Sequence, residues 1–199
     1  MLPPRDDLHF WLYDWLKAER LAAMPAFAHV DRDTGVAMID AALDLAASHF
    51  LPHAAASDQN PPQIVDGKVA LMPAIREALA AYREAGFFGM EAPQHEGGLG
   101  LPYTFVAAIG GLFSCANVAT NGYAFLTQAA ANLIREVGSD EQKRRFLPAM
   151  VEGRWFGTMC LSEPQAGSSL ADLRCVAEPL PDGRYAIRGN KMWISSGDH

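Results

Sequence analysis

The chain has 199 residues, of which 50% are hydrophobic and 20% charged, a composition typical of a globular protein with one core or two small domains. Its 16 basic and 23 acidic residues leave a net charge of −7 without a basic cluster, which argues against nucleic acid or an anionic membrane as a partner. Three cysteines without a CxxC spacing argue against a disulfide scaffold or a zinc site and predict a cytoplasmic location.

The N-terminal 30 residues predict an amphipathic helix and a loop, and they are too acidic and broken for a signal peptide. We expect residues 1–35 to form an extension wrapped on the main body. Apolar residues recur there at steps of three and four, the spacing of one helix face. The predicted face consists of Leu8, Trp11, Leu12, Trp15 and Leu16.

Two helices are predicted next, separated by a turn-rich segment. Residues 34–50 have helical periodicity, and Pro52 is expected to end that helix. Residues 56–69 are rich in turn formers and are expected to be exposed. Residues 72–88 predict a further helix with Gly86 as its stop. Its inward face is predicted to carry Ile75, Leu79 and Tyr82.

A long uncharged segment runs from Glu96 to Arg135, and its length alone would suit a membrane span. Glycine and polar residues interrupt it, and its longest apolar piece, FVAAIGGLF, is much shorter than the roughly 20 residues that a span requires. We therefore predict two buried helices, 103–118 and 121–137, and no membrane segment.

A last helix is predicted to begin at Ser139, where Gln142 gives the spacing of a capping box. After Gly153 the pattern changes to short apolar or alternating runs separated by turn residues. The predicted strands lie at 154–161, 174–180, 184–189 and 191–195. Helices followed by strands predict an α+β protein, with an all-α domain before the first strands of a β-barrel or β-sandwich domain.

Two further patterns carry little functional signal. His49 and His53 have the spacing of two helical metal ligands, but Pro52 lies between them and no third ligand is evident, so no metal site is predicted and surface or capping roles are expected. The glycine-rich segment 89–102 could approach a phosphate closely, although no P-loop lysine accompanies it.

The stretch MCLSEPQAGSSL, residues 159–170, is the strongest candidate for a binding loop. Pro164 fixes one backbone angle and Gly167 frees another, so that successive backbone N–H groups can converge on an anion such as a pyrophosphate. Serine hydroxyls add further donors. In the run KMWISSG, Trp193 and Ser195 would lie on one face of a strand and suit a heteroaromatic ring, while a core position is the plainer interpretation of Trp193 alone.

LSEPQAGSSLADL followed by DGRYAIRGNKMWISSG closely resembles the flavin-binding signature of the acyl-CoA dehydrogenase family. Upstream, GFFGMEAPQHEGGLGLP and GSDEQKRRFLPAMVEGRWFGTMCLSEP agree with that family in the same order. The resemblance covers the chain from about residue 36 onward. It implies an extension at 1–35, a helical domain at 36–153 and the start of an incomplete β domain at 154–199.

The resemblance also implies FAD as cofactor, with backbone at Met159 and Leu161 along the flavin and the Ser162 hydroxyl on its pyrimidine edge. Trp193 would pack beside the isoalloxazine, and Ser195 would reach toward the reactive nitrogen.

Gly167 and Ser168 would face the pyrophosphate, and Ser168 would also lie near the acyl-CoA. The chain departs from the family pattern at Ser169, where Asp is frequent, and at Gln165, where Gly is common. With the extension, Gln165 suggests the branch that acts on methylthiopropanoyl-CoA.

The implied reaction is α,β-dehydrogenation of an acyl-CoA thioester, with an electron-transfer flavoprotein as partner and a homo-oligomer as the full-length form. The base would be a glutamate beyond residue 199, so the chain is expected to be a truncated form that binds FAD weakly and has no turnover. Glu163 is interpreted as structural. Tyr123, Gln128 and Asn132 either line the acyl pocket or satisfy a buried helix–helix contact. Two alternatives stay open, a non-catalytic helical interaction protein and a flavin-dependent oxidase or monooxygenase.

Overall fold

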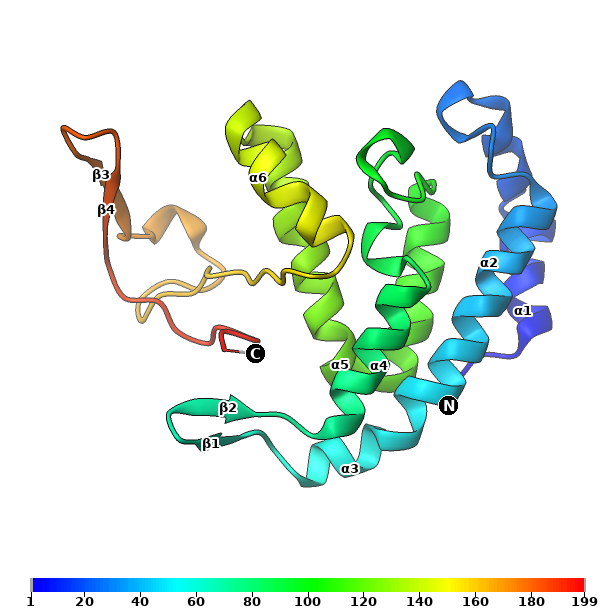
Figure 1. Cartoon of the computed structure of the whole chain (residues 1–199). Helices are drawn as coiled ribbons and strands as arrows, with labels where there is room; N and C mark the ends of the chain where they lie inside the picture. Colours follow the sequence, from blue (N-terminus) through cyan, green and yellow to red (C-terminus); the bar gives the residue numbers. More distant parts are fainter. Residues whose placement is uncertain (1, 199) are drawn as a thin grey trace.

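A computed structural model describes residues 2–198 as a body of packed helices followed by a smaller extended part (Figure 1). The helices are α1 (Arg5–His9), α2 (Arg32–Leu45), α3 (Ala54–Gln59), α4 (Pro73–Glu84), α5 (Tyr103–Val137) and α6 (Asp140–Val151). The strands form two antiparallel hairpins, β1 (Gln63–Val65) with β2 (Lys68–Ala70), and β3 (Val176–Pro179) with β4 (Tyr185–Arg188). The α+β prediction, with helices first and short strands after, is confirmed.

The N-terminal segment is helical as predicted, but its buried face differs from the predicted one. α1 continues into a π-helical turn, Phe10–Trp15, whose five-residue hydrogen-bonding step rotates the side chains relative to an α-helix. Leu12 and Tyr13 are therefore buried. The prediction is wrong for three residues that are exposed, Trp11, Trp15 and Leu16.

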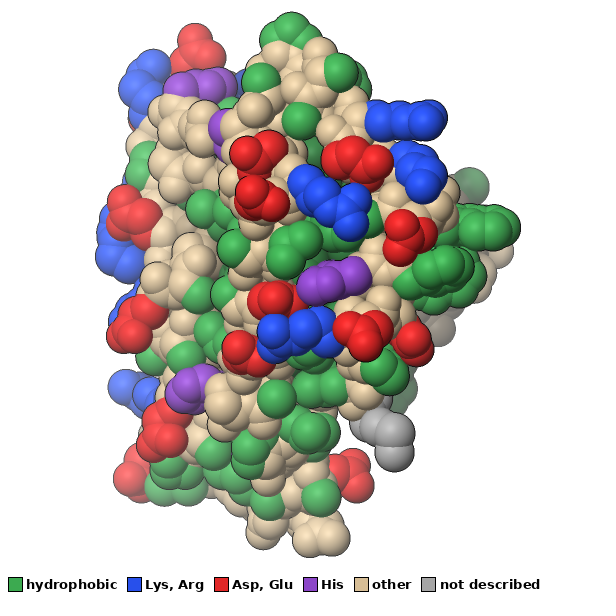
Figure 2. Space-filling view, turned by 90° about the vertical axis from the view of Figure 1, so that its right-hand side faces the viewer, with side chains coloured by type: hydrophobic (Ala, Val, Ile, Leu, Met, Phe, Trp, Pro, Cys, Tyr) green, Lys and Arg blue, Asp and Glu red, His purple; other side chains and the backbone are tan. Residues whose placement is uncertain are grey.

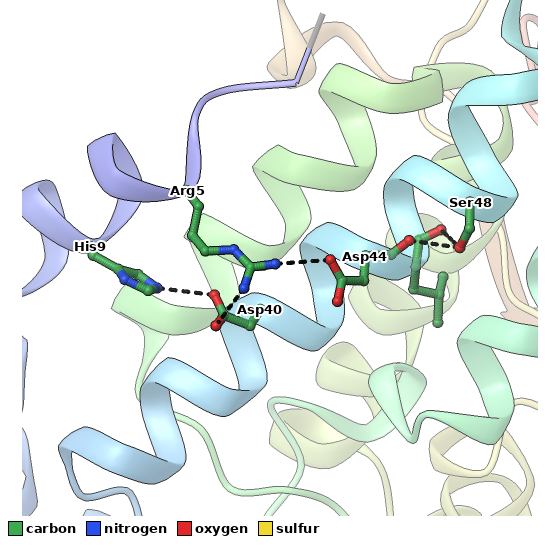
Figure 3. Close-up of polar contacts among 6 residues, drawn as sticks. Arg5, His9, Asp40, Asp44 and Ser48 are labelled. Carbon is green, nitrogen blue, oxygen red and sulfur yellow. Dashed lines mark hydrogen bonds and ion pairs between the residues drawn. The ribbon is translucent and has the colours of Figure 1, made fainter.

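Ion pairs attach α1 to α2 (Figure 3). The Arg5 guanidinium lies 3.0 Å from a carboxylate oxygen of Asp40 and 3.0 Å from one of Asp44. His9 Nε2 lies 3.1 Å from the other Asp40 oxygen. Just beyond the end of α2, the Ser48 hydroxyl donates to the Asp44 carbonyl at 2.6 Å. The first residues of the chain are thus fixed along one side of α2.

The helical path of α2 does not end at Pro52, contrary to the prediction. A π turn at Ala46–Phe50 and a 3₁₀ turn at Leu51–His53 carry the chain into α3. Pro52 lies at the start of the 3₁₀ turn, where a missing N–H group costs little. The segment after α3 is exposed as expected, although it contains the unpredicted β1–β2 hairpin.

The centre of the helical body is an aromatic cluster between the π turn at Ala46–Phe50, α4 and α5. Phe50, Tyr82 and Phe113 are fully buried, and the Tyr82 and Phe113 rings meet edge to face at 4.7 Å. The predicted inward face of α4 is confirmed, since Ile75 and Leu79 are buried with Tyr82. Gly86 has a φ of 76° just after α4, the left-handed conformation that ends helices.

α5 bends at Asn117, whose φ and ψ of −162° and 94° interrupt the helix. The prediction of two helices in this segment is confirmed. The break lies at Asn117, slightly before the predicted boundary between helices 103–118 and 121–137. The Asn117 amide donates to the Phe50 carbonyl at 3.4 Å and its oxygen accepts from the Thr120 N–H at 3.1 Å. His53 is buried rather than on the surface and bonds the Thr120 hydroxyl at 2.8 Å. Among the described residues no cluster suits a metal ion.

Two helical stretches, Arg32–Gln59 and Tyr103–Val137, are long and apolar enough to cross a membrane. Both pack against other helices here, and core helices of globular proteins have the same length and composition. The absence of a membrane segment therefore stays a prediction.

The extended part forms fewer strands than predicted. β3 and β4 fall within the predicted strands 174–180 and 184–189 and pair through the expected turn. Residues 154–161 and 191–195 form no strand, and Trp193 has the left-handed φ of 59°, so the prediction of strands there is wrong. Strands depend on hydrogen-bonded neighbours, and among the described residues no backbone hydrogen bond joins these two segments; the Met192 N–H bonds Ser162, just beyond the first of them.

Candidate functional site

The two C-terminal motifs, far apart in sequence, lie side by side in the structure. The Met192 N–H donates to the Ser162 carbonyl at 3.0 Å. Beside it, the Lys191 ammonium donates to the Leu161 carbonyl at 3.1 Å. The run KMWISSG is thus anchored to the beginning of the SEPQAGSS loop.

Glu163 organises this region through a buried carboxylate with four donors. Its side chain is only 2% exposed. It accepts hydrogen bonds from the Lys191 ammonium at 2.8 Å, from the backbone N–H groups of Arg174 at 2.7 Å and Cys175 at 2.9 Å, and from the Gln165 amide at 2.7 Å. The Lys191 bond, followed by the backbone bonds, lowers the pKa of Glu163 from 4.5 to about 2. Glu163 is therefore a structural anion, as predicted.

The loop after Glu163 is a tight turn followed by exposed residues whose N–H groups have no partner among the described residues. Glu163 and Ala166 exchange two backbone hydrogen bonds of 2.8 and 3.0 Å. Gln165, one of the departures from the family pattern, helps to hold this turn through Glu163. In the described part of the chain, the N–H groups of Gly167, Ser168 and Ser169 form no hydrogen bond. Those exposed donors are free to bind an anion.

The remaining predicted cofactor residues surround this loop without forming the expected strand face. Met159 and Leu161 are exposed, and Ser162 is half-buried. Trp193 is 82% exposed with a φ of 59°, so it is neither a core residue nor part of a strand. Ser195 is also exposed, and its carbonyl accepts a hydrogen bond from the Thr158 hydroxyl.

A groove of about 440 Å³ runs along α5. Gln128 and Asn132 line it, whereas Tyr123 does not. The Gln128 amide donates to the Phe87 carbonyl at 2.8 Å and to the Tyr82 hydroxyl at 3.2 Å. Gln128 therefore both lines the groove and satisfies a buried contact, so neither interpretation of it excludes the other.

Tyr123 points to the opposite side of α5. It lines a hollow with α4 residues, and burial raises the pKa of its hydroxyl while a hydrogen bond with Ser196 opposes that rise. Its contact is therefore with the C-terminal motif. Groove residues that the sequence interpretation missed are Gly110, Gly111, Asn121 and Phe125. Their spacing along the two predicted helices could have indicated them, because residues three or four positions apart share one helix face.

Carboxylates near the groove are already partnered. Glu91 accepts a hydrogen bond from the Asn132 amide. Glu96 forms an ion pair with Arg135 at 2.7 Å. These bonds join the glycine-rich segment to α5 and give the groove a polar wall.

The glycines of that segment serve close backbone packing. The Leu101 N–H donates to the Met90 carbonyl at 2.8 Å, and the Gly100 N–H donates to the Ala92 carbonyl at 2.8 Å. A Cβ atom on Gly98 would lie 2.1 Å from the Ala92 carbonyl oxygen. The segment therefore folds back on itself, which accounts for its composition without a phosphate.

Comparison with known proteins assigns the family. The family described as "Acyl-CoA dehydrogenase, N-terminal domain" matches residues 32–154, and the chain belongs to the acyl-CoA dehydrogenase family. The match begins at α2, so most of the predicted extension lies outside it.

Among curated relatives, a 3-methylmercaptopropionyl-CoA dehydrogenase of Ruegeria pomeroyi is 30% identical over 98% of this chain and 33% of its own length. A mitochondrial isovaleryl-CoA dehydrogenase of Arabidopsis thaliana is 33% identical over 57% of this chain and 28% of its own length. The chain thus spans about a third of the length of the curated relatives it matches.

Solved structures share the fold. Butyryl-CoA dehydrogenase from Megasphaera elsdenii matches with a TM-score of 0.69 and 23% identity, over 82% of this chain and 41% of its own. An acyl-CoA dehydrogenase from Bacillus anthracis, complexed with FAD, matches with a TM-score of 0.64 and 23% identity. The match covers 80% of this chain and 26% of that one.

Proposed function

We propose that this chain is part of an FAD-dependent acyl-CoA dehydrogenase that introduces an α,β double bond into an acyl-CoA thioester. The observation that carries the proposal is the bond from the Met192 N–H to the Ser162 carbonyl, because it brings the two halves of the flavin signature together. The finer assignment, to enzymes acting on a methylthiopropanoyl thioester, is supported by the Ruegeria relative and by Gln165.

The loop has features that fit the pyrophosphate of FAD. Gly167 and Ser168 are exposed, their N–H groups form no hydrogen bond in the described part of the chain, and a Cβ atom placed on Gly167 would meet nothing within 4 Å. Phosphate oxygens are acceptors that such donors bind. FAD, held by this loop, would supply the acceptor for the hydride that leaves the β-carbon. The proposed cofactor residues are Met159, Leu161, Ser162, Gly167, Ser168, Trp193 and Ser195.

The acyl group is proposed to enter the groove on α5. Gly110 and Gly111 leave its wall without side chains, and Asn121, Gln128 and Asn132 line it with amides. Ser168 is proposed to contact the acyl-CoA from the loop.

The α-proton is proposed to pass to a base outside residues 1–199. Glu163 has a lowered pKa and accepts four hydrogen bonds, which makes it a weak base. Glu91 and Glu96 are held by Asn132 and Arg135. We extend the proposal to an electron-transfer flavoprotein as redox partner, to a homo-oligomeric full-length form and to a cytoplasmic location.

Titration of the chain with FAD, followed by flavin fluorescence and calorimetry, tests the proposal. We expect weak saturable binding that Ser168→Ala and Trp193→Ala reduce, with Ser169→Ala as the matched control. Turnover of an acyl-CoA with an artificial acceptor by this chain alone would contradict the assignment of the base. Binding insensitive to Ser168 and Trp193 would contradict the assigned site.

A further inference from the structure

The outer side of the N-terminal segment carries an unusual combination of exposed side chains. Exposed residues recur there at four-residue steps, which places them on one face. We call this set the acidic–aromatic face, and it consists of Asp6, Asp7, Phe10, Trp11, Asp14 and Trp15. It lies outside residues 32–154, which match the family model, and the groove and binding loop described above use none of its residues.

The aromatic residues of this face are exposed and ordered against one another. Trp11 is 55% exposed and Trp15 is 68% exposed. Their rings meet edge to face at 5.9 Å, and Phe10 meets Trp11 in the same way at 5.7 Å. Figure 2 looks onto this side of the molecule and shows hydrophobic side chains protruding at its right-hand edge, with carboxylates nearby. Clustered exposed aromatic rings mark interaction surfaces.

The opposite side of the same segment is firmly attached. Leu12 and Tyr13 are buried, and Arg5 and His9 pair with Asp40. The π turn separates the buried residues from the exposed ones, so the tryptophans cannot turn inward while Leu12 and Tyr13 keep their positions. The acidic–aromatic face is therefore preorganised for binding.

The charges of the face select the kind of partner. Asp6, Asp7 and Asp14 form no ion pair within residues 2–198. Tryptophan faces attract guanidinium and ammonium groups, and adjacent carboxylates attract the same cations. A second copy of the chain would place carboxylates opposite carboxylates, and an anionic bilayer would repel them. We propose that the acidic–aromatic face binds a protein segment rich in arginine and lysine.

Binding of a nona-arginine peptide to the 199-residue chain tests this proposal. We expect the indole N–H signals of Trp11 and Trp15 to shift in NMR spectra, and those of Trp155 to stay unchanged. Replacing both tryptophans, Trp11→Ala with Trp15→Ala, should weaken the affinity about tenfold. Trp155→Ala, at another exposed tryptophan, is the matched control.

A second variant, Asp7→Asn with Asp14→Asn, keeps the test independent of any effect of the tryptophans on folding. It should weaken nona-arginine binding and reduce its salt dependence, and a nona-glutamate peptide should not bind. Equal affinity for the double tryptophan variant and the wild type would overturn the proposal in favour of general charge attraction. Dimerisation that requires Trp11 and Trp15, or binding to phosphatidylcholine vesicles without binding to nona-arginine, would overturn it in favour of a second copy or a membrane.

Discussion

At the scale of single residues, Glu163 shows how a buried charge is used for structure. A buried carboxylate is costly unless it is hydrogen-bonded, and Glu163 receives four hydrogen bonds, one from within the loop and three from later parts of the chain. Because two of the donors belong to residues 174 and 175, the charge ties the SEPQAGSS loop to the start of the β3–β4 hairpin.

The lowered pKa of Glu163 predicts a pH dependence of local stability. The folded form holds the proton less tightly than the unfolded form, so the contribution is complete above pH 4.5 and is lost as the pH falls toward about 2. We expect amide exchange at Arg174 and Cys175 to accelerate across that range. Glu163→Gln should make exchange fast at neutral pH and remove the dependence.

Glu178→Gln is the control for this experiment, because Glu178 pairs with Arg188 on an exposed part of the hairpin. Its effect should be small and screened by salt. Protection at Arg174 and Cys175 that persists unchanged in Glu163→Gln would show that the four hydrogen bonds do not hold the loop.

At the scale of elements, features that depend on neighbouring residues could be predicted from the sequence. Features that depend on pairing between distant segments could not. The Ser139–Gln142 capping box forms as predicted, because both hydrogen bonds lie within one turn of chain. The two motifs of the candidate site were found from short runs of residues. Strands at 154–161 and 191–195 were not realised, since strand formation depends on neighbours that a single run does not specify.

The capping box provides a test of α6. Ser139→Ala removes the acceptor for the Gln142 N–H and should destabilise the protein by about 1 kcal/mol. Arg144→Ala, on an exposed part of the same helix, should change stability by less than about 0.5 kcal/mol. Thermal denaturation of both variants checks the difference, and equal melting temperatures would show that α6 is fixed by packing alone.

At the scale of the whole molecule, the question is what holds the extension on the helical body. The Arg5 pairs with Asp40 and Asp44 are partly exposed, and such pairs contribute about 0–1 kcal/mol. Truncating a buried leucine costs about 2–5 kcal/mol. Burial of Leu12 should therefore dominate the attachment, with the ion pairs of Figure 3 setting its orientation.

Limited proteolysis after Lys17 measures this attachment. We expect Leu12→Ala to accelerate cleavage strongly, and Asp40→Asn to accelerate it only slightly and less at high salt. Strong acceleration by Asp40→Asn would reverse the ranking of burial over charge.

The register of this segment could not have been obtained from periodicity alone. Leu12 is buried, as the predicted inner face requires. Trp11 and Trp15 have the sequence spacing of that face but are exposed in the structure. The π turn at Phe10–Trp15 accounts for the difference. Its hydrogen bonds span five residues in place of four, which changes the direction of the side chains that follow. Tyr13, in this turn, packs against Phe105, a contact between distant parts of the chain that periodicity does not reveal.

The bend at Asn117 has a consequence for how α5 can vary. Both halves of the helix line the groove, with Gly110 before the bend and Phe125 after it, and both halves also carry buried residues. Inserting or deleting one residue just after the bend would turn the second half by about 100° and would move the buried Ala124 out of the core together with the groove residues. Lineages are therefore expected to change what the groove accepts by substituting its lining residues, while the length of α5 stays constant.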